Sequence, residues 1–397
     1  ASQPASSIHL RYPMTTAGNT GPRPMRLLEV LEPSGGGSGR HFLDLCRGMQ
    51  ARGHAVHAIY SPVRADRRFV EELTALNLAG LHAVAMMRMP GLSDFPAWWA
   101  LRGVMRRAGP FDIVHGHSSK AGALSRIRLP GPHVPRVYTP HAFRTMDPGL
   151  GTVGRTVFGT IEKILARSFT DRLVCVSADE YAHACALGIP REKLTLIVNG
   201  VATPPAGSRA PVRTALGIPD GALLFGFVGR LTHQKAPERL VAAFERLAER
   251  APHARLLMIG DGEMREALRR QIDAGRHAGR IHLTNDFTGP QAIAAMDALV
   301  VPSRYEAMSY AMLEAAAAGK PLILSDVGGA STVLKDGENG LLVANDDDPA
   351  PLAEAMLAFS RPGRLAPYAE AALARSRDYD LTRMIGETEA LYRSLLA

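Results

Sequence analysis

The run Leu27-Leu-Glu-Val-Leu31 is followed by Pro33-Ser-Gly-Gly-Gly-Ser-Gly39 and then by a helical pattern over residues 40–52. The rhythm repeats, with a short apolar run at 55–60 and a helical pattern at 67–77. Short apolar runs that alternate with amphipathic segments are typical of strand–helix–strand units. The opening of the chain therefore predicts a parallel sheet that is packed against helices.

This rhythm extends over two blocks of the chain. The first block ends near residue 200, and its later apolar runs lie at 81–86, 113–115, 136–139, 173–176 and 194–198. The segment 201–211 is rich in Pro, Gly and Ser, which is typical of a linker. The rhythm then restarts with apolar runs at 223–228, 255–259, 281–284, 298–301, 321–324 and 340–343. We expect an α/β protein with two Rossmann-like, doubly wound domains at 25–203 and 204–380.

Composition limits the classes of protein to consider. The 397 residues are 46% apolar and 21% charged, which is a globular balance, and no apolar stretch approaches the roughly 18 residues of a membrane span. The three cysteines are scattered and form no CxxC pair, so we expect neither a disulfide framework nor a cysteine metal site. Residues 1–24 are rich in Pro, Ser, Thr and Gly, and we expect a disordered extension there.

Charge divides unevenly between the two blocks. Residues 1–205 carry 24 Lys+Arg against 14 Asp+Glu, a net charge of +10, whereas residues 206–397 carry 22 against 24, a net charge of −2. The basic block indicates an anionic surface or substrate, such as lipid head groups, a lipid diphosphate or nucleic acid. The alternative is an arginine-rich solvated face without a partner.

Ligands of parallel sheets bind beyond the carboxyl ends of the strands, so the glycine loop after the first strand is a candidate site. Its backbone N–H groups and the helix dipole suit a phosphate or a closely approaching substrate at Gly36 and Gly37. The loop departs from the GxGxxG spacing, and no acidic residue is clearly placed for a ribose about 20 residues later. A tight turn without a ligand is the alternative interpretation.

Imidazoles gather after the expected strand at 111–114. The sequence His115-Gly-His117-Ser118-Ser-Lys120 follows it, and His141 stands at the end of a neighbouring strand. Histidine is the commonest acid–base group near neutral pH. We favour a structural role for His115 and a functional role for His117, and both interpretations stay open for His141.

The second block has cations and carboxylates in the same kind of position. Arg230 and Lys235 precede a helix expected from Pro237, where a guanidinium fork, an ammonium and the positive helix end suit a diphosphate. Glu306 follows a strand, and Glu314 lies in the otherwise apolar helix that Ser309 begins. Because a buried carboxylate is costly without partners, ligand hydroxyls or a salt bridge are expected at Glu314.

These blocks together resemble glycosyltransferase family 4, a retaining family with the GT-B fold, from residue 25 almost to the end of the chain. The resemblance rests on Glu306-x7-Glu314, Asp112-Ile-Val-His-Gly-His117, Val174-Cys-Val-Ser177, Val198-Asn-Gly-Val201, Gly229-Arg230 with Lys235, and Gly260-Asp-Gly-Glu263. It implies two domains that face a central cleft, with a final helix at 381–397 that returns to the first domain.

The resemblance also implies roles for single residues. Arg230 and Lys235 would bind the donor diphosphate and stabilise it as the leaving group, and Glu314 would hold the ribose hydroxyls. Glu306, with Ala307, Met308 and Ser309 after it, would contact the donor sugar and phosphate. His117 would lie beside the reacting centre, Gly36 and Gly37 near the diphosphate or acceptor, and Ser118, Lys120 and His141 near the acceptor.

The implied reaction moves a hexose from a UDP- or GDP-linked sugar, with retention, onto a glycan acceptor during polysaccharide assembly. Relatives often have Gly-Phe-Gly where this chain has Ala307-Met-Ser309, so the sugar itself is not specified. Arg230, Lys235 and helix dipoles can stabilise the leaving group, and no DxD pair stands in a suitable context, so we expect neither a cofactor nor a metal.

The resemblance, through family members with a basic N-terminal domain, implies a polyprenyl-diphosphate-linked glycan as the acceptor. Residues 94–107 combine both tryptophans with three arginines at roughly helical spacing, a pattern that fits an anionic bilayer, although an ordinary amphipathic helix on the sheet explains it equally well. We expect the protein in the cytoplasm, peripherally bound to the inner face of the cytoplasmic membrane.

Two other classes of function stay open. A sugar-nucleotide 2-epimerase would share the two-domain architecture, but Arg230, Lys235, Glu306 and Glu314 together favour a transferase. A nucleic-acid-binding module would use the positive charge, but no recognised motif supports it, and few aromatic residues stand among the basic ones. We therefore expect no nucleic-acid partner.

Overall fold

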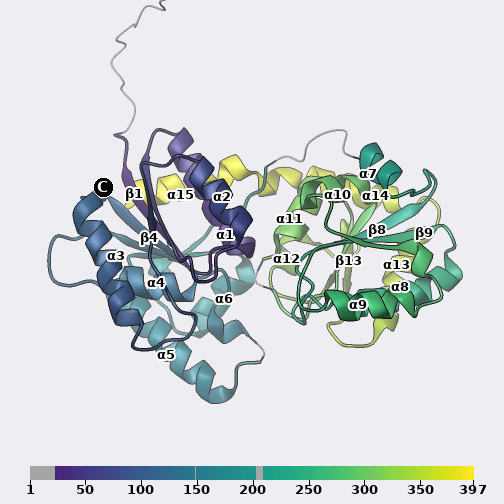
Figure 1. Ribbon diagram of the computed structural model, residues 1–397, viewed down its shortest axis with the longest axis horizontal. Coiled ribbons are helices and arrows are strands. Elements are labelled where there is room, and N and C mark those ends of the chain that lie inside the picture. Colours follow the sequence, from purple (N-terminus) through teal and green to yellow (C-terminus); the bar gives the residue numbers. More distant parts are fainter. Residues whose placement is uncertain (1–22, 148, 203–208, 307) are drawn as a thin grey trace, which may run out of the picture.

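The protein has two lobes, each built on a parallel sheet with helices on its faces (Figure 1). The computed structural model describes residues 23–147, 149–202, 209–306 and 308–397. Residues 1–22 of the expected extension and 203–208 of the expected linker lie outside this part of the chain. No helix within the described ranges is long and apolar enough to cross a bilayer.

The first lobe contains a seven-stranded sheet in the order β3-β2-β1-β4-β5-β6-β7. Its strands are β1 (Arg26–Leu31), β2 (Ala55–Tyr60), β3 (Gly80–Ala83), β4 (Ile113–His117), β5 (Arg136–Thr139), β6 (Arg172–Cys175) and β7 (Leu194–Leu196). Its helices are α1 (Gly36–Ala51), α2 (Arg67–Ala75), α3 (Asp94–Ala108), α4 (Ser119–Arg126), α5 (Thr152–Phe169) and α6 (Ala178–Ala186), with 3-10 turns η1 (Arg144–Met146) and η2 (Arg191–Lys193).

The second lobe contains a six-stranded sheet in the order β10-β9-β8-β11-β12-β13. Its strands are β8 (Leu223–Val228), β9 (Ala254–Ile259), β10 (Ile281–Thr284), β11 (Ala298–Val301), β12 (Leu322–Ser325) and β13 (Gly340–Val343). Its helices are α7 (Arg209–Ala215), α8 (Pro237–Arg250), α9 (Arg265–Asp273), α10 (Gly289–Ala295), α11 (Tyr310–Ala317), α12 (Ala330–Val333), α13 (Pro349–Ser360) and α14 (Leu365–Ala374), with η3 (Ala278–Arg280) and η4 (Ser376–Tyr379).

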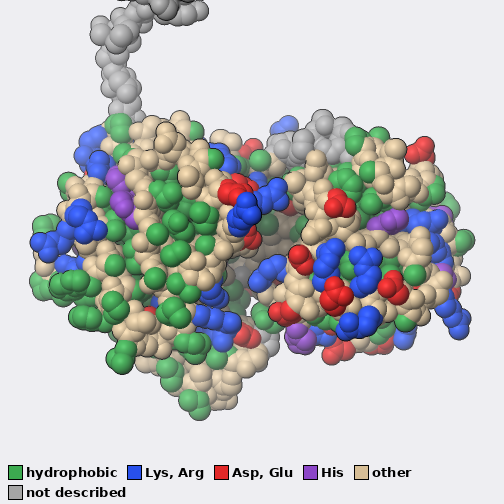
Figure 2. All heavy atoms as spheres, viewed as in Figure 1, with side chains coloured by type: hydrophobic (Ala, Val, Ile, Leu, Met, Phe, Trp, Pro, Cys, Tyr) green, Lys and Arg blue, Asp and Glu red, His purple; other side chains and the backbone are tan. Residues whose placement is uncertain are grey.

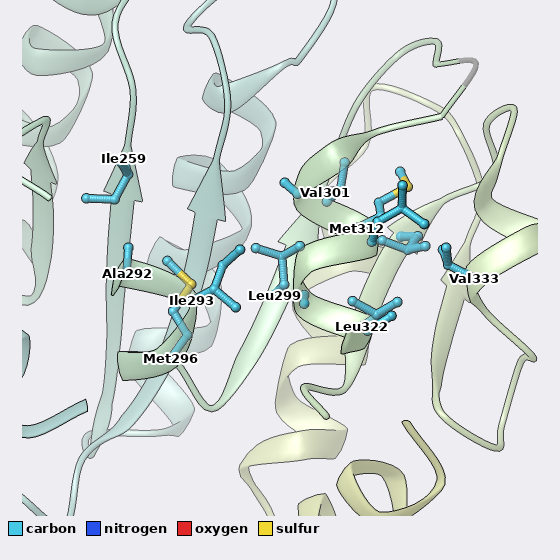
Figure 3. Close-up of a cluster of buried hydrophobic side chains, with 14 of the residues drawn as sticks. Ile259, Ala292, Ile293, Met296, Leu299, Val301, Met312, Leu322 and Val333 are labelled. Atoms are coloured by element: carbon cyan, nitrogen blue, oxygen red, sulfur yellow. The ribbon is translucent and has the colours of Figure 1, made fainter. Parts of the chain in front are cut away.

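Apolar side chains from both elements fill the space between each sheet and its helices. In the second lobe, Ile293 of α10 and Met296, the C-cap residue of that helix, meet Leu299 of β11, and Met312 of α11 packs near Leu322 of β12 (Figure 3). Strands that are buried on both faces read as continuous apolar runs, which is why the sequence pattern marked them clearly. The doubly wound, parallel fold predicted from that pattern is confirmed.

The last helix, α15 (Leu381–Ser394), crosses from the second lobe back to the first (Figure 1). Its side chains Met384, Ile385, Leu391 and Tyr392 join the apolar cluster between the first sheet and α1. A close backbone approach fixes the crossing point, because a Cβ on Gly200 would stand 2.5 Å from the Asp380 carbonyl oxygen. The first lobe therefore contains both early and late parts of the chain.

Candidate active site

Two cations stand between the end of β8 and the start of α8 in the second lobe. Arg230 is exposed, and its guanidinium has no ion-pair or hydrogen-bond partner among the described residues. Lys235 is largely buried, and its ammonium forms an ion pair with Glu306. Since α8 begins at Pro237, its positive dipole end directly follows the loop that carries both residues. The arrangement suits a phosphate or diphosphate.

The loop after β11 is fastened to the loop after β8. The Ser303 hydroxyl donates to Glu306 Oε1 at 2.8 Å, so that this carboxylate accepts from a hydroxyl and an ammonium together. The backbone N–H of Arg304 donates to the Gln234 carbonyl at 2.8 Å, and the Gln234 amide donates to the Tyr305 carbonyl at 3.1 Å. The two loops thus form a single rim at the carboxyl ends of β8 and β11.

Residues after Glu306 lead directly into α11. Met308 and Ser309 are buried, and Ser309 is the N-cap residue, although its side chain makes no capping hydrogen bond. Ala307, which the sequence placed beside the donor, lies outside the described residues. The phenolic oxygen of Tyr310 is buried and has no hydrogen-bond partner within the described chain. The first turn of α11 therefore presents polar groups that its own lobe does not satisfy.

Glu314 lies one turn further along α11 and is half-buried. No described residue donates a hydrogen bond to its carboxylate. Burial raises the pKa of Glu314 to about 7, while the charge of Arg40 opposes that shift and the charge of Asp44 adds to it. Glu314 therefore forms no salt bridge with a described residue. A ligand that donates hydroxyl groups would supply the missing partners.

The glycine loop of the first lobe faces this part of α11 across the cleft. A Cβ on Gly37 would stand 3.7 Å from the Tyr310 ring, whereas a Cβ on Gly36 would meet nothing within 4 Å. Gly36 has a φ of +62°, a conformation that L side chains rarely adopt. The space-filling view shows the surface hollowed between the lobes (Figure 2). Gly36 therefore faces open space, and Gly37 lies close to Tyr310 of the second lobe.

A hydrogen-bonded histidine network occupies the first lobe. Strand β4 continues through His117, two residues beyond the expected end, so His115 and His117 lie inside the sheet and are fully buried. His117 Nε2 lies 2.8 Å from Glu29 Oε2, and its Nδ1 lies 3.1 Å from Nε2 of His141. His115 lies between Thr139 and Tyr392, at 2.8 Å from Oγ1 and 2.6 Å from the phenolic oxygen.

Sequence reasoning missed two members of this network, Glu29 and Tyr392. Glu29 stands in β1 opposite His115 and accepts a hydrogen bond from the Tyr392 hydroxyl at 2.9 Å. Burial raises the pKa of Glu29 to about 8, against the lowering effect of Tyr392. The signal for Glu29 was present as a single charge within an apolar strand. No local pattern marks Tyr392, because α15 reaches the site only through the tertiary fold.

His141 joins the same network through an unusual backbone. His141 and Ala142 have φ angles of +52° and +83°, the left-handed region that non-glycine residues seldom occupy. The buried carboxylate of Glu180 accepts a hydrogen bond from the Ala142 N–H at 2.8 Å and a second from Val176 N–H at 2.8 Å. This strained turn lays the His141 ring against His117, with ring centroids 5.4 Å apart.

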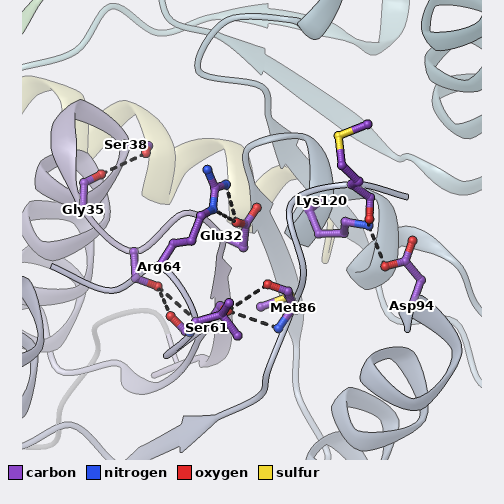
Figure 4. Close-up of polar contacts among 11 residues, drawn as sticks. Glu32, Gly35, Ser38, Ser61, Arg64, Met86, Asp94 and Lys120 are labelled. Carbon is purple, nitrogen blue, oxygen red and sulfur yellow. Dashed lines mark hydrogen bonds and ion pairs between the residues drawn. The ribbon is translucent and has the colours of Figure 1, made fainter. Parts of the chain in front are cut away.

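Lys120 and Ser118, expected near the acceptor, occupy different environments. Lys120 donates to Asp94 Oδ1 at 2.5 Å and to the Met89 carbonyl at 3.0 Å, and this ties α4 to the start of α3 (Figure 4). Ser118 is the N-cap residue of α4 and has a φ of +66°. Also in the first lobe, Glu32, directly after β1, forms an ion pair with Arg64 (Figure 4). Lys120 is thus engaged in structure, and the strained Ser118 lies directly after His117.

Helix α3 divides its two tryptophans between the core and the surface. Ala97, Leu101 and Val104 are buried against the sheet, and Trp98 donates its ring N–H to the Ile127 carbonyl at 3.1 Å. Trp99 is 57% exposed. Other apolar residues before and within α3 are also exposed, namely Met87, Met89, Leu92 and Phe95. The helix covers the sheet with one side and presents an apolar surface with the other.

Comparisons with known proteins support the resemblance over both lobes. A model of glycosyltransferase family 4 matches residues 35–203, and a model of the glycosyl transferases group 1 matches residues 222–361. The chain is 33% identical to a D-inositol 3-phosphate glycosyltransferase of Xylanimonas cellulosilytica over 69% of this chain and 70% of that protein.

The chain is also similar in sequence to a bacterial galactosyltransferase and in structure to a solved protein of Anabaena. The chain is 32% identical to the UDP-Gal:alpha-D-GlcNAc-diphosphoundecaprenol alpha-1,3-galactosyltransferase of Escherichia coli over 60% of this chain, and it spans 63% of that enzyme's length, just under two thirds. The fold superposes on Anabaena HepE, solved with UDP and glucose, with a TM-score of 0.76, 20% identity and coverage of 93% and 100%. The chain therefore belongs to glycosyltransferase family 4, and its two lobes form the GT-B fold.

Proposed function

We propose that the protein transfers a hexosyl group, with retention and without a metal cofactor, from a UDP- or GDP-linked sugar to a polyprenyl-diphosphate-linked glycan during polysaccharide assembly. One observation carries the proposal. Polar groups without partners, Arg230 and the Glu314 carboxylate, gather on the second-lobe side of the cleft, and the ordered histidines stand in the first lobe. An unpaired cation and an unpaired carboxylate fit a diphosphate and a pair of hydroxyls in one donor molecule.

The two cations stabilise the departing nucleotide diphosphate. Arg230 offers a planar fork of donors, Lys235 a compact charge, and the start of α8 its backbone dipole. Negative charge grows on the diphosphate as the bond to the sugar breaks, so fixed positive groups stabilise the transition state more than the bound donor. This arrangement supplies the electrostatic role for which other enzymes use a divalent ion.

Remaining contacts divide between the sugar and the nucleoside. Glu314 accepts hydrogen bonds from the ribose hydroxyls, while Glu306, Ala307, Met308 and Ser309 contact the sugar and its phosphate. Glu306 is held ready by Lys235 and Ser303. Gly36 and Gly37 let the first lobe approach the diphosphate without a side chain in the way.

His117 stands beside the reacting carbon in this proposal. The acceptor hydroxyl attacks the face from which the diphosphate leaves, and a leaving phosphate oxygen helps to take the hydroxyl proton, so the configuration is retained. His117 stabilises the reacting centre in the transition state through a ring that Glu29 orients, with Ser118, Lys120 and His141 on the side where the acceptor arrives.

The acceptor assignment is supported by the surface of the first lobe and by a relative. The Escherichia coli relative acts on a diphosphoundecaprenol-linked sugar. The basic first lobe presents Leu92, Phe95 and Trp99, which are 96%, 69% and 57% exposed, next to the arginines of α3. An apolar surface flanked by arginines fits the head-group region of an anionic membrane on its cytoplasmic side.

The transferase proposal is tested by nucleotide release from UDP-, GDP- and ADP-sugars, with and without a polyprenyl-diphosphate-linked sugar acceptor. We expect acceptor-stimulated release from one donor, formation of an extended glycolipid with retained anomeric configuration, and loss of both in Glu314→Ala. Interconversion of the donor without net transfer would instead show an epimerase, and silence with every donor and acceptor would overturn the proposal.

Membrane contact is tested separately by flotation with vesicles that contain phosphatidylglycerol. The double variant Phe95→Ser/Trp99→Ser is expected to lose binding. The control Leu373→Ser, which changes a 60% exposed leucine of the second lobe, is expected to keep it. Equal flotation of all three proteins would exclude α3 as the contact surface.

A further inference from the structure

Three histidines from separate elements meet at the wall of the first lobe. His41 comes from α1, His117 from the end of β4 and His141 from the loop after β5. The ring centroid of His41 lies 4.7 Å from that of His141 and 5.5 Å from that of His117. One ligand nitrogen of each ring lies within 4.8 Å of the other two. Three ligands around one zinc ion stand about 3.3 Å apart, given Zn–N bonds near 2.0–2.1 Å, so small side-chain shifts would complete a site.

Two of the three rings, those of His41 and His117, have an oxygen partner at the nitrogen that points away from the cluster. His41 Nδ1 lies 2.9 Å from Asn199 Oδ1, which can only accept, so this nitrogen carries the proton and Nε2 keeps its lone pair. Nε2 of His117 lies 2.8 Å from the Glu29 carboxylate, which leaves Nδ1 to face His141. A carboxylate or amide oxygen behind a ligating imidazole is the usual second support of a metal site.

The protein also holds the cluster in place at a cost in backbone strain. Left-handed φ angles at His141 and Ala142 bring the His141 ring over the other two, and the buried Glu180 fixes that turn. Strained backbone persists where the surrounding structure enforces it, and it concentrates at functional sites. His141 is also the half-buried member of the cluster, so the site opens at its edge.

The three imidazoles lie in a buried environment that disfavours their charged form. Burial lowers the pKa of His41 and of His117 to about 3, and it lowers the pKa of His141 well below its ordinary value. Glu29 faces this group from β1, and His115 faces it from β4.

We propose that His41, His117 and His141 form a binding site for a divalent transition-metal ion, with zinc as the first candidate. Three neutral imidazoles suit zinc, nickel, copper or cobalt, whereas magnesium and calcium prefer oxygen ligands. Three protein ligands leave a fourth position open to water or to a substrate oxygen.

The inference of a metal site does not depend on the proposed function, because its test measures binding alone. Full-length protein, stripped of metal with a chelator, is titrated with ZnCl2 in competition with a chromophoric zinc chelator, and cobalt(II) is added in parallel to record visible absorption bands. We expect one zinc ion per chain and tetrahedral cobalt bands. His41→Ala and His141→Ala should each weaken zinc binding by roughly 100-fold or more, beyond the 10–100-fold typical of outer-shell changes. Magnesium should not compete.

Control variants identify the ligand set. Glu29, His115 and His117 form a second group of potential ligands, so His115→Gln is compared with His41→Ala. Binding that survives in His115→Gln and fails in His41→Ala supports the proposal, and the reverse pattern overturns it. His253→Ala changes an exposed histidine of the second lobe and should bind zinc as the unaltered chain does. Undetectable zinc binding in the unaltered chain, or equal binding in every variant, also overturns the site. Circular dichroism confirms that each variant is folded.

Discussion

The two walls of the cleft differ in how far each satisfies its own polar groups. On the second lobe, Arg230 has no partner among the described residues, Glu314 accepts no hydrogen bond from them, and Tyr310 keeps a buried hydroxyl unpaired. On the first lobe, His115 and His117 have partners for both ring nitrogens. Unpaired buried groups are costly, whereas paired ones rigidify a site. In the proposed function, a ligand would therefore supply the partners that the second lobe lacks, whereas His115 and His117 of the first lobe already have theirs.

The largest effect is expected from a change at Lys235, which contacts the leaving diphosphate in the proposed function. Lys235→Ala should lower donor turnover roughly 100- to 1,000-fold, the usual cost of removing one donor to a developing negative charge. Steady-state nucleotide release measures it. Lys335→Ala is the matched control, because Lys335 lies in the same lobe, is 66% exposed and pairs with Glu338. Full turnover in Lys235→Ala would place the leaving group elsewhere.

A change in the ordered wall should separate chemistry from binding. His117→Asn is expected to lower kcat by about 100-fold, within the range for a group at a reacting centre, while the Kd for the donor stays the same. Steady-state assays measure kcat, and calorimetry measures the Kd for the donor. The control is His183→Asn, a half-buried histidine of the same lobe that bonds Thr145. If Kd rose as kcat fell, His117 would also contact the donor in its ground state.

The incomplete wall should also respond to pH. Glu314 has a raised pKa of about 7 in the free protein, and hydroxyls that donate to it favour its charged form. Binding of a UDP-sugar should therefore strengthen as pH rises through 7 and weaken below it, approaching tenfold per pH unit in acid. Burial is the main cause of this raised pKa, the charges of Arg40 and Asp44 modify it, and Tyr310 also lies near the carboxylate. Calorimetry from pH 6 to 8.5 checks this, and Glu314→Gln should flatten the curve. A wild-type affinity that ignores pH would remove Glu314 from the ribose site.

The smallest effect concerns the support behind the ordered wall. Tyr392→Phe removes the hydroxyl that bonds both Glu29 and His115, and it should lower the free energy of unfolding by roughly 1–2 kcal/mol, as for a buried group that loses its partner. Denaturant unfolding measures it. Tyr368→Phe is the control, since the Tyr368 hydroxyl makes no hydrogen bond among the described residues. Equal stability of the two variants would show that the network adds nothing to the fold.

The sequence predicted the fold well because buried parallel strands are continuous apolar runs. The expected strands at 55–60, 136–139, 223–228, 281–284, 298–301 and 340–343 match the observed bounds. The predicted and observed ends of elements differ where contacts with other elements determine the end. Polar histidines suggested that β4 stops early, yet pairing with β5 carries it to His117. Helix α1 begins at Gly36 and not at residue 40, since three glycines gave no helical signal.

The sequence marked residues at strand ends, but it did not show which distant elements of one lobe come into contact. Arg230, Lys235, Glu306 and Glu314 stand in loops or helices that directly follow strands, where ligands of such sheets bind, and the structure brings them to one rim. His41, by contrast, lies inside an amphipathic helix, where a buried histidine has no distinctive pattern. Its meeting with His117 and His141 depends on how α1 packs against β4, which only the tertiary structure shows.

The return of α15 to the first lobe has a consequence for how the protein is made. A ribosome completes the strands of the first sheet long before it adds Met384, Leu391 and Tyr392, which belong to that lobe's apolar cluster. Until those residues emerge, one face of the early lobe lacks its cover, and Glu29 lacks the hydroxyl that it accepts from. The half that is synthesised first is therefore the half that is finished last, and it stays exposed to chaperones and proteases throughout translation.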